Sequence, residues 1–153
     1  PHWTEKQINS FWKKYFINML TKATPKQYAP EILKKLKKEK NNIIIITSRY
    51  GVLPNSKIIE NYTKKWLKNN NIPYDKLIMN AQNKLEAAKK VNIDLFIDDS
   101  ISHCKKVQEG NIKALLYTTI MNQNIDIPEL DRVYSWPQIY AKYKNIKNNQ
   151  NIE

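Results

Sequence analysis

The chain has 153 residues, of which 41% are hydrophobic, so it is long and apolar enough to fold as one domain with a real core. Its longest apolar run falls far short of a membrane span, no secretory signal is visible, and the single cysteine, Cys104, excludes an internal disulfide. These features are typical of a cytoplasmic protein, with no membrane partner.

The net charge of +12 allows a nucleic-acid surface. However, lysine, asparagine and isoleucine are enriched along the whole chain, and lysines such as Lys34, Lys35, Lys37 and Lys38 recur on the polar face of an expected helix. Solvated helix faces explain this charge more simply. Nucleic acid is therefore not the partner that we expect.

The chain opens with signals for a helix. Thr4 and Gln7 stand at capping-box spacing, in which each side chain bonds the other residue's backbone N–H. An apolar stripe follows at helical spacing, and we expect it to be buried; it comprises Ile8, Phe11, Trp12, Tyr15, Phe16, Met19 and Leu20. We assign residues 1–28 to a small helical cap.

Downstream, strands alternate with helices. The expected helices are a helix from near Pro30 to Asn41, then Ser56–Asn70, Asn83–Val91, Ser100–Gln108 (stopped by Gly110) and Pro137–Tyr143. The expected strands are Ile43–Ile46, Lys76–Met79, Asp94–Ile97 and Ile112–Tyr117. This order predicts an α/β fold with a parallel, Rossmann-like sheet and helices on both faces. We assign residues 29–143 to this core and 144–153 to a frayed polar tail.

Polar residues gather where the strands end. Thr47-Ser48-Arg49 follows the first strand, Asn83-Lys84 follows the second, and Asp98-Asp99-Ser100 follows the third. Parallel sheets bind ligands beyond these carboxyl ends. Each piece alone has a simpler reading: Thr47-Ser48 as a turn, Lys84 as a solvated lysine, and Asp99 or Ser100 as a helix cap. The combination favours phosphoryl transfer, in which donors hold phosphoryl oxygens and paired carboxylates bind Mg²⁺.

With these motifs the sequence resembles the haloacid-dehalogenase-type (HAD-type) phosphatases, and within them the bacterial branch of the cytosolic 5′(3′)-deoxyribonucleotidase type. The resemblance covers about Ile43 to Trp136. It is carried by Thr47 and Arg49, Trp66-Leu67, Ile72-Pro73-Tyr74-Asp75, Lys84, and the run from Ile93 to Ser100.

The resemblance implies a role for each matched residue. Thr47 would bond a phosphoryl oxygen with help from Ser48 and Arg49, and Lys84 would hold the phosphoryl group and favour the ionised nucleophile. Asp98 and Asp99 would bind Mg²⁺, and either could be the direct ligand. The substrate would be a small phosphorylated molecule such as a nucleotide, and a homodimer is a further expectation.

One part of the family pattern is missing. The nucleophile of such phosphatases is the first Asp of an Asp-x-Asp motif on an N-terminal strand, and this sequence contains no Asp-x-Asp. We expect that strand upstream of Pro1, beside the Ile43 and Asp94 strands, which would then not pair directly with each other. The alternatives are an inactive HAD-like binding module and a nucleic-acid-binding domain. A Cys–His couple of His103 and Cys104 is a remote option, because helix neighbours point apart.

Overall fold

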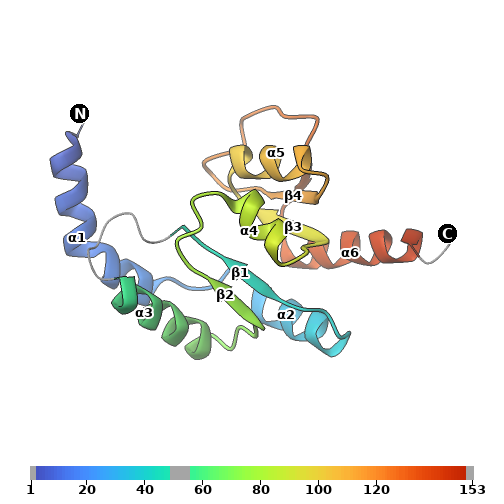
Figure 1. The fold of residues 1–153 in the computed structure, drawn as a ribbon, viewed down its shortest axis with the longest axis horizontal. Helices are drawn as coiled ribbons and strands as arrows, with labels where there is room; N and C mark the ends of the chain where they lie inside the picture. Colours follow the sequence, from blue (N-terminus) through green and yellow to red (C-terminus); the bar gives the residue numbers. More distant parts are fainter. Residues whose placement is uncertain (1–2, 49–55, 151–153) are drawn as a thin grey trace. The chain divides into compact units, whose positions relative to one another are not determined.

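A computed structural model describes residues 3–48 and 56–150 of the chain. The helices are α1 (Glu5–Lys22), α2 (Ala29–Lys38), α3 (Ser56–Asn69), α4 (Lys84–Lys90), α5 (Ile101–Glu109) and α6 (Trp136–Gln150). The strands are β1 (Ile44–Ile46), β2 (Lys76–Ile78), β3 (Leu95–Asp98), β4 (Lys113–Tyr117) and β5 (Asp131–Val133). The fold is mixed α/β with small parallel sheets, consistent with a Rossmann-like fold, as the sequence predicted (Figure 1).

The chain divides into two compact units, each described here by itself. The first unit comprises Pro1–Lys26 and Leu33–Gln82, and the second comprises Gln27–Ile32 and Asn83–Glu153. A parallel pair, β1-β2, forms the sheet of the first unit, and three parallel strands in the order β3-β4-β5 form that of the second. The sequence predicted that the Ile43 and Asp94 strands would not pair directly, and the described strands β1 and β3 belong to different sheets. Within these sheets β1 and β3 do not pair with each other.

The core of the second unit is built around β4, its central strand. Three consecutive β4 residues, Ala114, Leu115 and Leu116, are fully buried, because both faces of the strand are covered. Leu115 packs with Val133 of β5 and Ile139 of α6. Helix α5 contacts β3 and β4, and Figure 1 shows α5 and α6 on opposite sides of this sheet. The carboxyl ends of β3 and β4 are thereby held on a rigid support.

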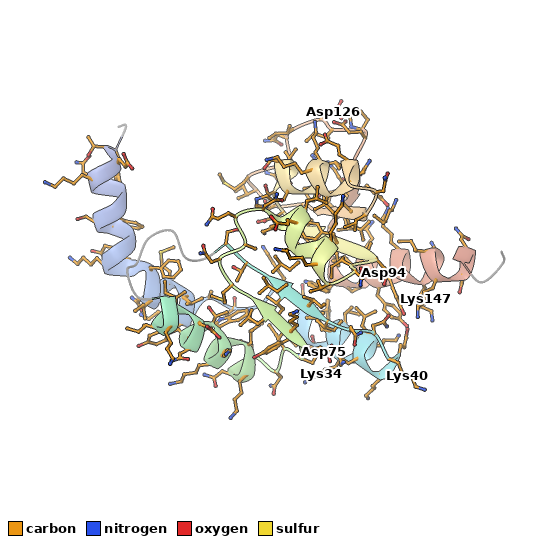
Figure 2. All side chains as sticks on the ribbon, in the orientation of Figure 1. Lys34, Lys40, Asp75, Asp94, Asp126 and Lys147 are labelled. Carbon is orange, nitrogen blue, oxygen red and sulfur yellow. The ribbon has the colours of Figure 1, made fainter. Side chains whose placement is uncertain are left out.

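In the first unit, Asp75 sets the register of β1 against β2. Its carboxylate accepts the Ile43 N–H at 2.6 Å and pairs with the Lys37 ammonium at 2.6 Å, while the Asp75 N–H donates to the Ile43 carbonyl at 2.8 Å. Figure 2 labels Asp75 beside the start of β2. These bonds align Ile44 with Lys76 as the first residue pair of the sheet. The strand β1 itself is half-buried, less than its apolar sequence predicted.

The opening helix is capped as predicted but is less buried than predicted. The Gln7 side chain accepts the Thr4 N–H at 2.8 Å and the Thr4 hydroxyl accepts the Gln7 N–H, which completes the capping box. Of the apolar stripe, Leu20 is buried, whereas Tyr15 is exposed and Met19 is 48% exposed. Helix α1 packs along α3 of the same unit (Figure 1), and one neighbouring helix can cover only part of so wide a stripe. The side chains of Ile8 and Trp12 lie outside the described ones.

The last third of the chain differs from the sequence prediction at two places. The strand β5 was not predicted, because Asp131-Arg132-Val133 contains one apolar residue and shows no strand periodicity. The last helix is also longer than the predicted Pro137–Tyr143, since α6 continues to Gln150 through part of the expected polar tail. Tyr143 is buried near the middle of α6, and such packing stabilises a helix whose asparagines have low helix propensity.

Helix α5 ends at Gly110 as predicted, but for a different physical reason. Gly110 has φ −80°, which any residue can adopt, and the left-handed residue is Asn111, with φ 62°. What Gly110 provides is space, because a Cβ atom there would overlap the Leu85 Cδ1 methyl group of α4. Any larger residue at this position would therefore force the Leu85 side chain to move.

No helix within the described ranges has the length and apolarity that crossing a bilayer requires.

The Asp75 contacts predict a pH-dependent stability. Hydrogen bonding to Lys37, then to the Ile43 N–H, lowers the pKa of Asp75 below its ordinary value of 3.8. A depressed carboxyl pKa stabilises the fold above the unfolded-state pKa, and this stability is lost as the pH falls through the folded-state pKa. Urea unfolding should therefore show wild type more stable than Asp75→Asn near neutral pH, with the difference vanishing in acid. A difference that persists below the folded-state pKa would contradict this account.

The glycine contact predicts a coupled pair of substitutions. Gly110→Ala should destabilise the protein by about 1–3 kcal/mol, as overpacking of a filled site does. In a Leu85→Ala background the same change should become neutral or stabilising, because the methyl groups that it meets are gone and alanine restricts the unfolded chain. Chemical denaturation of the four proteins measures this cycle. Equal effects of Gly110→Ala in both backgrounds would show that the contact is not the cause.

Candidate functional site

The predicted site residues fall into two groups, one in each unit. Thr47 and Ser48 follow β1 in the first unit, whereas Lys84, Asp98 and Asp99 belong to the second. Arg49, the remaining predicted phosphate-binding residue, lies outside the described residues.

In the first unit, backbone bonds hold Thr47 in place. Its N–H donates to the Ile78 carbonyl at 2.9 Å, and its carbonyl accepts the Ala81 N–H at 3.0 Å. The Ser48 hydroxyl donates to the Ala81 carbonyl at 3.0 Å. Among the described residues of this unit the Thr47 hydroxyl has no hydrogen-bond partner. The Thr47 hydroxyl is a group that can donate a hydrogen bond to a ligand. The Ser48 hydroxyl instead donates its hydrogen bond to the Ala81 carbonyl.

In the second unit, the structure brings Lys84 and Asp98 together. Lys84 is the first residue of α4, which Asn83 caps through its side chain, and its ammonium donates to Asp98 Oδ2 at 2.5 Å. The two side chains are only 12% and 9% exposed. Asp98 Oδ1 accepts the Ser100 N–H at 2.8 Å and lies 3.4 Å from His103 Nδ1. The Asp98 carboxylate is thus buried and surrounded by donors.

The adjacent Asp99 is in a different environment. Asp99 is exposed, and within residues 3–48 and 56–150 its carboxylate has no hydrogen bond or ion pair. Its backbone is nevertheless held, because the Asp99 carbonyl accepts the Asn122 side-chain amide at 2.9 Å. Sequence reasoning gave both acids the same role, but the structure distinguishes a buried carboxylate that accepts a hydrogen bond on each oxygen from an exposed one.

The two carboxylates fit a hydrated magnesium ion. Among the described residues, no group of three or more His, Cys, Asp or Glu side chains is arranged to hold a metal. Mg²⁺ is held in many enzymes by one or two carboxylates and keeps several of its waters. Asp99, with both oxygens open, is the better candidate for direct contact, and Asp98 stands one residue away as a second negative charge.

The structure gives no support to a Cys–His couple. Burial, followed by the negative charge of Asp98, raises the pKa of the Cys104 thiol to about 12. The thiol lies within weak hydrogen-bonding distance of two backbone carbonyls, those of Asp98 and Leu115, at 3.6 and 3.7 Å. His103 is directed instead at the Asp98 carboxylate. Cys104 is therefore a neutral core residue and not a nucleophile.

Sequence reasoning missed Asn122 and Arg132, which lie close to the acidic pair along the hydrogen-bond network. Asn122 stands in an irregular stretch and Arg132 in a strand that was not predicted. Neither matches a motif, and only long-range contacts reveal them.

The buried pair predicts energetic coupling. Lys84→Met should destabilise the protein by about 3–5 kcal/mol, because it leaves the Asp98 charge buried with weaker compensation. Adding Asp98→Asn should restore part of that loss, since the uncompensated charge is then gone. Urea unfolding of wild type, both single variants and the double variant measures the coupling. Strictly additive losses would mean that the two side chains do not interact in solution.

The sequence of this chain is similar to those of several known proteins. No protein-family model matches it. It is 26% identical over 137 residues to a nucleotidase of Clostridium acetobutylicum, and 30% identical over 124 residues to the Bacillus subtilis protein named "Putative nucleotidase YqfW". These alignments cover 89% and 80% of the chain, and the chain spans 68% and 61% of the two relatives. A Bacillus cereus protein with a similar name is 28% identical, over 78% of the chain and 60% of its own length. The chain is thus similar over most of its length to proteins named as nucleotidases.

Proposed function

We propose that this chain is the larger part of a magnesium-dependent phosphomonoester hydrolase of the HAD type, acting on a nucleotide. The observation that carries the proposal is the Lys84–Asp98 ion pair beside the open Asp99 carboxylate, at the carboxyl end of a parallel strand. A cation and two acids at such an edge are the groups that phosphoryl transfer requires. The similarity to proteins named as nucleotidases favours a nucleotide as substrate.

Each of the predicted site residues has its own role in this proposal. The Thr47 hydroxyl, with the backbone around Ser48, donates hydrogen bonds to phosphoryl oxygens, and Arg49 contributes a positive charge. Lys84 brings its ammonium to the phosphoryl group while it remains paired with Asp98. Asp98 and Asp99 would hold Mg²⁺, which would supply positive charge against the phosphoryl oxygens.

The proposed reaction proceeds through an aspartyl-phosphate. A carboxylate attacks phosphorus as the ester P–O bond breaks, and the ester oxygen takes up a proton from solvent and leaves as the alcohol. Water then attacks the phosphorus of the acyl phosphate and returns a proton to solvent, which gives inorganic phosphate and the free carboxylate. The sequence of this chain contains no Asp-x-Asp to supply that carboxylate. The proposal therefore assigns the nucleophile to a strand of the protein outside this chain. The relatives, which are longer than the region aligned, leave room for such a segment.

The metal site gives the first test. Asp98→Asn/Asp99→Asn should weaken Mg²⁺ binding strongly, because it removes both negative charges, while far-UV circular dichroism stays unchanged. Isothermal titration with MgCl₂ measures the affinity. Exposed Asp126, on the loop labelled in Figure 2, gives a control, since Asp126→Asn also removes a surface carboxylate but should leave binding unchanged. Equal affinity of wild type and the double variant would refute the assignment.

Activity gives the second test. The protein extended at its N-terminus to the length of the relatives should release phosphate from nucleoside monophosphates in the presence of Mg²⁺, and the 153-residue chain alone should not. Lys84→Met in the extended protein should lower kcat/KM by several orders of magnitude, since the cation then no longer stabilises the transition state. An extended protein that binds Mg²⁺ and nucleotide without hydrolysis would identify a binding module instead.

A further inference from the structure

The connection from β4 to β5 contains a buried asparagine whose hydrogen-bonding capacity is fully used. Asn122 is 3% exposed, although it lies in a loop whose other members Ile120 and Met121 are among the most exposed apolar residues of the described chain. A buried amide is costly unless its donors and acceptor are satisfied. The position of Asn122 therefore depends on specific partners.

Each half of the Asn122 amide bonds two groups. Nδ2 donates to the carbonyls of Asp99 and Tyr117, both at 2.9 Å. Oδ1 accepts the Thr119 N–H at 3.1 Å and an Arg132 guanidinium N–H at 3.3 Å. The donating half thus faces the ends of β3 and β4, and the accepting half faces its own loop and β5.

Arg132 fixes the orientation of this amide. Its guanidinium also donates to the backbone carbonyls of Asn122, at 3.1 Å, and Ile125. A group that can only donate must face the oxygen of the amide, so the nitrogen is directed to Asp99. Arg132 itself is carried by β5, which pairs with β4, so the orientation is anchored in the sheet.

The bond from Asn122 acts on the peptide unit between Asp99 and Ser100, which is also bonded to the Asp98 side chain. The Asp99 carbonyl and the Ser100 N–H belong to one planar peptide group. Asn122 holds the carbonyl end of this group at 2.9 Å, and Asp98 Oδ1 holds the N–H end at 2.8 Å. Fixing this plane fixes where the Asp99 side chain leaves the backbone and gives Asp98 one of its donors.

We propose that Asn122 is a positioning residue for the acidic pair: its side-chain amide, oriented by Arg132, pins the Asp99–Ser100 peptide so that the Asp99 carboxylate is directed to a divalent cation. This rests on the metal role given to Asp98 and Asp99 in the proposed function. Residues behind a metal ligand commonly change metal affinity by 10–100-fold when they are replaced, because they orient the ligand.

Asn122→Asp separates positioning from charge. The substitution keeps the shape and an oxygen for Thr119 and Arg132, but it places an oxygen against the Asp99 and Tyr117 carbonyls, where the amide had donated. Its added negative charge alone would attract a cation and tighten binding. Asn124→Asp is the matched control, since it adds the same charge to an exposed position of the same loop. A positioning role thus predicts weaker cation binding by Asn122→Asp, whereas the added charge alone predicts tighter binding.

The measurement is Mn²⁺ binding, followed by electron paramagnetic resonance without substrate. Asn122→Asp should raise the Kd for Mn²⁺ by about 10–100-fold, whereas Asn124→Asp should leave it unchanged or slightly lower. An Asn122→Asp Kd equal to or below that of Asn124→Asp overturns the positioning role and leaves the proposed function intact. If wild type itself binds no Mn²⁺, the metal site fails and the positioning role fails with it.

A second readout does not depend on metal. In metal-free protein, the Ser100 amide should lose protection from hydrogen exchange in Asn122→Asp but keep it in Asn124→Asp, because only the former releases the Asp99–Ser100 peptide. Unchanged protection overturns the proposal. If Asn122→Asp does not fold, Arg132→Lys serves as the test. It keeps the positive charge but removes the guanidinium group whose two nitrogens bond Asn122. It should weaken Mn²⁺ binding in a folded protein, and an unchanged Kd overturns the proposal.

Discussion

A carboxylate that is nine-tenths buried has to be compensated, and Asp98 obtains its compensation from three directions. Lys84 supplies a cation from α4, the Ser100 N–H supplies a backbone donor from the start of α5, and His103 approaches from the first turn of α5. An uncompensated charge at this position would cost several kcal/mol. The placement of α4 and α5 at the end of β3 is thus tied to one side chain.

This constraint separates the roles of the two adjacent acids. Each oxygen of Asp98 accepts a hydrogen bond, so Asp98 holds the lysine and the local backbone in place while keeping acceptor sites for an ion. Within the described residues, the Asp99 carboxylate makes no hydrogen bond. Only the Asp99 backbone is held, because its carbonyl accepts the Asn122 side-chain amide. In the proposed magnesium site, Asp98 would be the fixed group and Asp99 the group that remains available to the ion.

Asparagine has a second structural role in this chain, which contains only two glycines. Asn71, Asn92 and Asn111 each follow a helix and adopt positive φ, between 50° and 62°. Helices commonly end in such a left-handed residue, and after glycine, asparagine tolerates it best. The abundance of asparagine, which in the sequence resembles a compositional bias, therefore includes positions where it replaces glycine. Glycine is retained at Gly110, where the neighbouring Leu85 leaves no room for a Cβ atom.

The sequence by itself determined the features that depend on residues close together in the chain. The Thr4–Gln7 capping box and the helix Ser56–Asn70 were predicted within a residue or two, because caps and periodicity act over a few residues. The contact of Lys84 with Asp98 agrees with the expectation that strand ends gather polar groups, while the roles of Thr47 and Asp99 remain predictions.

Only the tertiary structure decided the difference between Asp98 and Asp99, the exposure of Met19, and the existence of β5. It also revealed the bond from Asn122 to Asp99, across 23 positions of sequence. Burial and hydrogen-bond partners depend on groups distant in the chain, and the same residue type is exposed or saturated according to what the fold brings against it.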